Sequence, residues 1–538
     1  MLLLLVLLQL KKLQNKNLTK QNEIKDFCVS ENLVTRKARN NQYFQYYSNS
    51  RSLWNGSFYG KMPTAINDFF ENAVEYRSLY RYNILISNAT LLQKEDKVKN
   101  IHSTGNKQKN IIFYFTDQQR ADTFNPDIMP YLSEYSEDGA VFSNCYTCQP
   151  VCGPARACLQ TGVYATECSC FKNGQSLPGD MPHLADYFND AGYYTAYIGK
   201  WHLATDSTYM CEKTAVPEDR RGGYKYWRAA DVLEFTSDGQ GGVVFDEKEN
   251  AVEFSGYRPD CINDFALEYL SQWDKSKPFF MFISQLEPHH QNNKKSYEGY
   301  PPTVDRFKDY PIPEDLTFLK GDYNEHYANY LSAINRIDYN IKLLVEKLKE
   351  MGIYEDTVIV FTSDHGCHFK TRNLEYKRSC HDSSTHIPLV IFGGGLDYSG
   401  KDENLVSLID LPATLLSVAG IKIPEHFKGN DLFEGLSRDA VYVQISESKC
   451  ARSIRTKDYK YSVSVPTYIA GMKMESSPVY MEEYLYDLNS DPYEKHNLIT
   501  SPSYKRLRKS LREILLREMQ NAGETPAKIL HAIISRKK

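Results

Sequence analysis

Short apolar runs recur through the middle of the chain, and each has the length of a buried strand. They lie at 111–115, 193–198, 278–283, 357–361 and 387–392. Before the fourth run, apolar residues from Ile334 to Leu348 recur at helical spacing and stop ahead of Gly352. Continuous apolar runs that alternate with helices are typical of a sheet covered on both faces. The pattern predicts an α/β fold with a largely parallel mixed sheet sandwiched by helices.

The pattern changes after residue 430. Residues 441–465 alternate between apolar and polar side chains as antiparallel strands do, and 484–488 has the composition of another strand. Apolar residues from Leu507 to Leu515 form one stripe of a basic terminal helix. We therefore expect a smaller C-terminal α+β subdomain. The predicted organisation is an N-terminal segment of unknown role, partly disordered, at 1–107, a main α/β domain at 108–430, the subdomain at 431–525 and a tail at 526–538.

The chain of 538 residues is long enough for more than one domain. Lys and Arg number 64 and Asp and Glu number 68, so the formal net charge is 64 − 68 = −4. This balance gives no indication of nucleic-acid binding, and we expect the Lys and Arg of the terminal helix to form a solvated face. Any anion-binding site must therefore be built from a local group of residues.

The twelve cysteines do not predict a zinc site, because those between Cys145 and Cys170 lack paired zinc-ligand spacing. Cysteines that stay reduced or pack in a core favour an intracellular setting. The apolar stretch Met1–Leu10 is too short to span a bilayer and has no visible cleavage site. We expect a cytoplasmic protein without a membrane span. Secretion stays open if Met1–Leu10 serves as the hydrophobic part of a signal peptide, and the oligomeric state is left open.

Titratable residues follow four of the five predicted strands. They are Asp117, Lys200 with His202, His289, and Asp364 with His365. Each alone has an ordinary explanation, since an Asp after a strand is usually a turn or cap residue and a loop His is usually exposed. In an open parallel sheet, however, ligands bind beyond the carboxyl ends of the strands. The agreement of four strand ends predicts one shared site.

The residue types at these strand ends favour a hard divalent cation. Asp117 and Asp364 would offer carboxylate oxygens, and these suit Ca²⁺ or Mg²⁺. Gln118 could add an amide oxygen and His365 a ring nitrogen. An oxygen-rich set without a Cys/His cluster disfavours zinc.

The segment Cys152–Gly162 has the local features of a short helix. Pro154 suits its first turn, and Gly162 suits a C-terminal stop. Cys152 would then lie at the helix N-terminus, where unpaired amides and the helix dipole favour a negative group. Arg156, one turn further on, could bind an oxyanion with its guanidinium. The plainer interpretation is a buried cysteine beside a proline turn.

The same segment resembles the signature of the type I, formylglycine-dependent sulfatases of the alkaline phosphatase-like superfamily. The signature is Cys-x-Pro-x-Arg followed by Leu-x-Thr-Gly, and the matching residues are Cys152, Pro154, Arg156, Leu159, Thr161 and Gly162. Further blocks resemble this family, in order, between residue 110 and about residue 500. They are Thr116–Arg120, Gly199–Leu203, Pro288 with His289, Ser363–Gly366, Lys377 with Asp382 and Pro388, and Tyr486–Leu498.

The resemblance implies hydrolysis of a sulfate ester of a sugar or another alcohol to the alcohol and inorganic sulfate. Cys152 would be converted to formylglycine by a maturase and would attack sulfur as the aldehyde hydrate. His202 would help to eject the sulfate, and His289, assisted by Lys377, would protonate the leaving alcohol. The implied catalytic residues are Cys152, Arg156, Lys200, His202, His289 and Lys377.

The resemblance also implies a metal site, most often for Ca²⁺. The implied ligands are Asp117, Gln118, Cys152, Asp364 and His365. Two of these positions depart from the commonest pattern, because many members have Asp in place of Gln118 and Asn in place of His365. The versions in this chain resemble the choline-sulfatase and phosphonate monoester hydrolase branches. Mg²⁺ and Mn²⁺ therefore stay open.

Three functions remain in competition at this point. Besides a sulfatase, the chain could be a phosphonate monoester or phosphodiester hydrolase with the same nucleophile, or a non-catalytic binding protein in which Cys152 stays unmodified. The predicted substrate-binding residues are Lys200, His289 and Lys377, together with Trp227 and Arg228 from the aromatic segment 205–260. Ring and guanidinium groups suit a sulfated sugar, although the last two residues are equally expected as packing elements.

Overall fold

The computed structural model describes residues 108–435, 438–467 and 472–532, which all fall within one compact unit. The segment predicted at 1–107, including Met1–Leu10, lies outside the described residues. Within the described part of the chain, no helix has the length and apolar character needed to cross a bilayer.

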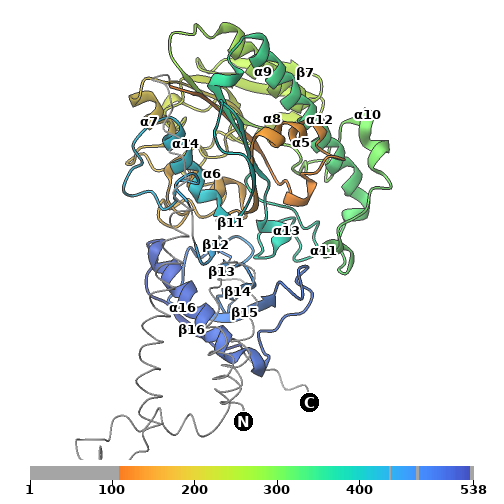
Figure 1. Ribbon diagram of the computed structural model, residues 1–538, viewed down its shortest axis with the longest axis vertical. Coiled ribbons are helices and arrows are strands. Elements are labelled where there is room, and N and C mark those ends of the chain that lie inside the picture. The colour runs from red at the N-terminus through yellow and green to blue at the C-terminus, as the bar shows by residue number, and fades with distance from the viewer. Residues whose placement is uncertain (1–107, 436–437, 468–471, 533–538) are drawn as a thin grey trace, which may run out of the picture. The chain divides into compact units, whose positions relative to one another are not determined.

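A large mixed sheet with helices around it forms the first part of the described chain (Figure 1). In the described residues it has eleven strands, in the order β11-β2-β10-β9-β1-β8-β3-β4-β6-β5, with β7 beside β6. The strands are β1 (Asn110–Thr116), β2 (Ala140–Tyr146), β3 (Tyr194–Lys200), β4 (Tyr226–Ala230), β5 (Ser237–Asp238), β6 (Gly241–Asp246), β7 (Ala251–Ser255), β8 (Phe279–Ser284), β9 (Thr357–Ser363), β10 (Leu389–Gly393) and β11 (Gly400–Ser407).

The five apolar runs of the sequence correspond to β1, β3, β8, β9 and β10. Strands β4, β3, β8, β1 and β9 are parallel, whereas β10 is antiparallel to both β9 and β2. The predicted α/β class and mixed sheet are therefore confirmed. Strands β2, β6 and β7 gave no clear apolar run, because each has partly exposed positions.

Helices cover both faces of this sheet. Alternate residues of β1 point into two separate apolar clusters: Ile111, Phe113 and Phe115 into one, and Ile112 and Tyr114 into the other. The first cluster is closed by α6 (Cys152–Thr161), α7 (Leu184–Asp190) and α14 (Leu411–Val418). The second is closed by α5 (Pro130–Tyr135), α9 (Arg258–Gln272) and α12 (Tyr323–Glu350). Short helices α8 (Leu233–Thr236), α10 (Pro301–Val304), α11 (Glu314–Thr317) and α13 (Asp382–Thr385) lie in the connections.

A second sheet forms the C-terminal part, as predicted. It has the order β12 (Val441–Ile445), β13 (Ala451–Arg455), β14 (Tyr459–Ser464), β15 (Val479–Asp487) and β16 (Lys528–Leu530), with α16 (Lys505–Asn521) packed on it. β16 pairs in parallel with β15, so the predicted tail at 526–538 contains a strand. A three-residue strand is too short to produce a periodic signal. One apolar cluster joins residues of both sheets, so the two parts share a core.

Gly199 lets β3 and β8 approach each other closely at their carboxyl ends. It has φ +105°, and an added Cβ would lie 2.0 Å from the carbonyl oxygen of Ser284. Only glycine adopts this conformation without strain and leaves that space free. The neighbouring residue Lys200 therefore depends on Gly199 for its position.

We expect Gly199→Ala to lower the free energy of unfolding by about 3 kcal/mol or more, because the methyl group would push β3 away from β8. Gly352→Ala is the matched control, since Gly352 also has a positive φ of 68° but open space around its Cα. The control should cost only about 1 kcal/mol. Denaturant unfolding followed by circular dichroism measures both, and equal losses would contradict the steric explanation.

Candidate active site

The ends of four parallel strands, β1, β3, β8 and β9, meet at one edge of the large sheet. Asp117 directly follows β1, and Asp364 follows β9, whose Ser363 is paired with Thr116. Lys200 ends β3, and His289 lies five residues beyond the end of β8. The structure thus brings together the titratable residues that the sequence placed after separate apolar runs.

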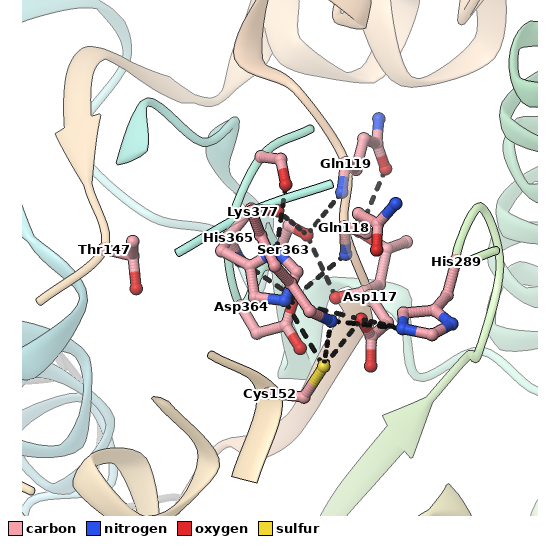
Figure 2. Close-up of polar contacts among 12 residues, drawn as sticks. Asp117, Gln118, Gln119, Thr147, Cys152, His289, Ser363, Asp364, His365 and Lys377 are labelled. Carbon is pink, nitrogen blue, oxygen red and sulfur yellow. Dashed lines mark hydrogen bonds and ion pairs between the residues drawn. The ribbon is translucent and has the colours of Figure 1, made fainter. Parts of the chain in front are cut away.

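Cys152 is the first residue of α6 and lies buried among charged groups. Its Sγ accepts a hydrogen bond from Lys377 Nζ at 2.6 Å and lies 3.3 Å from Asp117 Oδ1 and 3.3 Å from His365 Nε2 (Figure 2). The helix ends at Gly162, which has φ +70°. A cysteine that only filled a core would have apolar neighbours, so these contacts favour a chemical role.

The environment of Cys152 stabilises a negative charge. Burial alone would raise the pKa of the thiol, but Lys377, Lys200 and His365 outweigh burial and lower this pKa well below its usual range. A hydrogen bond with His202 lowers it further. An anionic nucleophile is therefore favoured at position 152.

Arg156 and Lys200 are fully buried and both pair with Asp117. Their nitrogen atoms lie 3.1 and 3.0 Å from Asp117 Oδ2. Arg156 also donates to Ser284 Oγ at 2.6 Å, and its guanidinium lies 5.1 Å from the ring centroid of Phe115. These contacts hold the two cations rigidly beside Cys152.

Four buried side chains form a group that could hold a metal ion. One ligand atom from each of Asp117, Cys152, Asp364 and His365 lies within 4.8 Å of all the others. His365 Nδ1 lies 2.9 Å from the carbonyl oxygen of Gly366, so Nδ1 carries the proton and Nε2 offers a lone pair. Burial and then the charge of Asp117 raise the pKa of Asp364 to about 7. A divalent cation would relieve this repulsion and so fits the group.

Gln118 is the fifth implied ligand and lies next to this group. It has φ +72°, and its backbone N–H donates to Asp364 Oδ1 at 2.9 Å. Its side-chain Nε2 donates to Tyr297 Oη at 2.7 Å, whereas Oε1 is buried and accepts no hydrogen bond from any described residue. Oδ2 of Asp364 is likewise without a hydrogen bond there. Both oxygens could bind a cation, although Asp364 Oδ2 also lies 3.7 Å from a guanidinium nitrogen of Arg156.

A pocket of about 320 Å³ opens beside Cys152 and is lined by His202, His289 and Lys377, among others. His289 Nε2 lies 3.1 Å from Lys377 Nζ and 4.0 Å from Asp117 Oδ1. Burial and then the charge of Lys377 lower the pKa of His289, and an anionic ligand would oppose this effect. The pocket lining thus combines two imidazoles with the ammonium group of Lys377.

The sequence left open whether Trp227 and Arg228 bind substrate or pack in the fold, and neither residue lines this pocket. Trp227 is fully buried and stacks on Tyr197 at 5.4 Å between ring centroids. Arg228 pairs with Glu247 at 2.8 Å. Both lie in the middle of β4, whereas ligands bind beyond the ends of such strands.

Two further polar residues support the site and were missed in the sequence. Glu234 in α8 has Oε1 3.2 Å from Lys200 Nζ. Asn173 Oδ1 accepts a hydrogen bond from the backbone N–H of Gly153 at 3.0 Å, at the start of α6. Glu234 follows β4, which was not recognised as a strand, and Asn173 lies in a loop, so neither had a local signal.

Comparison with known proteins gives two family matches. The profile described as Sulfatase matches residues 109–421, and the profile described as N-sulphoglucosamine sulphohydrolase, C-terminal, matches residues 373–521. An ulvan-active sulfatase of Formosa agariphila is 29% identical over 472 residues, which cover 82% of this chain and 87% of that protein. An N-acetylglucosamine-6-O-sulfatase of Bacteroides thetaiotaomicron is 25% identical over 506 residues, which cover 76% and 86%.

A similar fold is found among solved structures. One is a protein in complex with its substrate D-glucosamine-2-N,6-O-disulfate, with a TM-score of 0.66 and 22% sequence identity. The match covers 78% of this chain and 98% of that protein. The two proteins therefore share their overall architecture.

We expect Lys377→Met to raise the pKa of the Cys152 thiol in the unmodified, metal-free protein. Burial would then be opposed by fewer cations, so the thiolate would form only at higher pH. Alkylation of Cys152 by iodoacetamide as a function of pH, followed by peptide mass spectrometry, measures the change. Lys449→Met, in the C-terminal part, is the control, and an unshifted profile in Lys377→Met would contradict this account.

Proposed function

We propose a nucleophile and a substrate class for this chain, which belongs to the sulfatase family and hydrolyses sulfate esters. The nucleophile is a formylglycine formed from Cys152, and the alcohol is a sugar. The observation that supports this nucleophile most strongly is that Cys152 Sγ belongs to the metal-ligand group and also accepts a hydrogen bond from Lys377.

Sγ of Cys152 stands in for a hydroxyl oxygen of the hydrated aldehyde. One hydroxyl attacks sulfur and the ester oxygen leaves with a proton as the alcohol. A base then removes the proton of the second hydroxyl, the bond between the formylglycine carbon and the sulfate oxygen breaks, and the aldehyde re-forms. His202, which lines the pocket, is suited to this base role. Water rehydrates the aldehyde for the next cycle.

The ligands proposed for the metal are Asp117, Gln118, Asp364 and His365, together with residue 152. Their oxygen-rich character favours Ca²⁺, with Mg²⁺ or Mn²⁺ as alternatives. When bound, such an ion would polarise a sulfate oxygen and lower the pKa of the attacking hydroxyl.

The chain's own cations neutralise the remaining charge on the sulfate. Arg156 and Lys200 are held by Asp117, and Lys377 donates directly to position 152. Sulfuryl transfer, like phosphoryl transfer, depends chiefly on positioning and on stabilising charge at the equatorial oxygens. Donors that are already fixed before the substrate binds need no reorganisation during the reaction.

The leaving alcohol would receive its proton from the pair formed by His289 and Lys377. Their nitrogen atoms lie 3.1 Å apart, so the ammonium of Lys377 can supply a proton through the imidazole. A sugar hydroxyl is a poor leaving group without such a proton. A pocket of about 320 Å³ has room for a small ligand such as one sugar unit. The similarity to sulfatases named for ulvan and for N-acetylglucosamine also supports a sugar.

Co-expression with a formylglycine-generating enzyme tests the nucleophile. We expect the peptide containing residue 152 to show the mass of an aldehyde in place of the thiol, and the purified protein to release sulfate from sugar monosulfates. Chelation should abolish the activity and added Ca²⁺ should restore it, because the ligand oxygens then regain their cation. Cys152→Ala is the inactive control. An unmodified thiol would favour a binding role, and faster cleavage of a phosphonate monoester would favour that substrate class.

His289→Asn should distinguish the proposed acid from a residue that only shapes the pocket. We expect kcat/KM to fall about 100-fold or more for a sugar sulfate, because its alkoxide needs a proton as it leaves. For 4-nitrophenyl sulfate, whose leaving group needs little protonation, the loss should be less than about 10-fold. Steady-state kinetics with both esters measure the difference, and equal losses would contradict the acid role.

A further inference from the structure

One buried carboxylate oxygen in the pocket has no role in the mechanism described above. Glu234 is only 4% exposed and lines the same pocket as Cys152 and His289. Its Oε1 lies 3.2 Å from Lys200 Nζ, but its Oε2 is buried and makes no hydrogen bond with any described residue. A buried polar atom without a partner is costly, so an atom of this kind in a binding pocket points to a ligand.

The need to neutralise the charge of Lys200 does not by itself explain why a second oxygen of Glu234 is buried in the pocket. Asp117 Oδ2 already lies 3.0 Å from Lys200 Nζ, and one oxygen of Glu234 is enough to complete that contact. The second oxygen remains for another donor. Burial would raise the pKa of Glu234, but the charges of Lys200, His289 and His202 lower it to about 2, so the ionised carboxylate can only accept hydrogen bonds.

The backbone around Glu234 is held firmly in place. Gln291 Nε2 donates to the carbonyl oxygen of Glu234 at 3.0 Å and to that of Ser237 at 3.2 Å. Arg258, which is buried and paired with Glu287 at 2.7 Å, donates to Ser237 Oγ at 3.0 Å. Such support is expected of a side chain that must meet a ligand at a fixed position.

Among the described residues that line the pocket, the cation besides Lys377 is already paired and is not free for an additional anionic group. Arg378, a cation in the lining, pairs with Glu375 at 2.9 Å and also with Glu447. Glu212 adds another carboxylate to the lining, while Lys213 lies 5.8 Å from the ring centroid of Phe235 and is exposed. The surroundings of Glu234 therefore favour a neutral or positively charged substituent.

We infer that Glu234 Oε2 accepts a hydrogen bond from a hydroxyl or amino group of the substrate, on a carbon close to the sulfated one. The inference rests on the proposed function, because the sulfate must lie at Cys152 and the ester oxygen at His289 for such a group to reach Glu234. It narrows the substrate to monosulfated sugars, neutral or amino, and disfavours simple alkyl or aryl sulfates. Glu234 is then a specificity-determining residue as well as a partner of Lys200.

The test uses the matured enzyme, the 2-, 3-, 4- and 6-sulfates of glucose, galactose and glucosamine (the 2-sulfate of glucosamine being its N-sulfate), and 4-nitrophenyl sulfate. For the best sugar sulfate, deoxy analogues are prepared at each remaining hydroxyl or amino position. We expect one of these deletions to lower kcat/KM about 10- to 100-fold in the wild-type enzyme. In Glu234→Gln the same deletion should lower it less than about 3-fold, because the charged acceptor is already absent.

4-Nitrophenyl sulfate separates two roles of Glu234, which are recognition of the sugar and the contact with Lys200. Any loss for 4-nitrophenyl sulfate in Glu234→Gln reports only the effect on Lys200, since this ester has no neighbouring hydroxyl. Glu350→Gln, at the exposed end of α12, makes the same charge change far from the pocket and should leave all rates unchanged. If Glu234→Gln lowers the rates for the parent sugar sulfate and all its deoxy analogues by one common factor, the inference is overturned.

Binding measurements distinguish failure of the inference about Glu234 from failure of the proposed function. If no sulfate ester were hydrolysed, the proposed function would fail. Calorimetric titration of the Cys152→Ala protein with the same twelve sugar sulfates and the deoxy analogues of the tightest binder would still test Glu234. A deletion that weakens binding about 10-fold or more in Cys152→Ala, but not in Cys152→Ala with Glu234→Gln, supports the inference. Equal binding of parent and analogues, or no binding of any of them, overturns it.

Discussion

The candidate site depends on one buried carboxylate, that of Asp117. Arg156 and Lys200 both pair with its Oδ2, while its Oδ1 lies 3.3 Å from Cys152 Sγ and 3.7 Å from His365 Nε2. Removing one member of such a buried charge set typically costs about 3–5 kcal/mol, because the remaining charges are left uncompensated. The position of Asp117 at the end of β1 therefore limits where the nucleophile, the cations and the metal ligands can lie.

The C-terminal sheet also supports this arrangement. Lys460 of β14 pairs with Asp382 and Glu494, and Tyr486 of β15 lies 3.1 Å, from Oη to Nε2, from His381. These contacts fasten the segment that follows Lys377. The second family profile spans residues 373–521 and so includes both the Lys377 segment and the sheet that holds it. The subdomain boundary near residue 430 separates two sheets but does not separate them in function.

Much of the fold could be predicted from residues that lie close together in the chain. Fully buried strands such as β1 and β9 consist of continuous apolar residues, and the long stripe of α12 repeats at helical spacing. The direction of β10 could not be predicted in this way, because an apolar run has the same composition in a parallel and an antiparallel neighbour. The role of Trp227 could not be decided for a related reason, since an aromatic side chain can pack in a core or line a pocket.

The sequence by itself determined the family, the α/β class and the residues at four strand ends, because local patterns and a short motif report these directly. Only the tertiary structure decided which groups meet. Lys377 reaches Cys152 across 225 positions of the chain, and Glu234 has one oxygen without a hydrogen bond in a pocket that both histidines also line. Charge pairing and burial depend on distances in space, and local sequence patterns do not show which distant residues folding brings into contact.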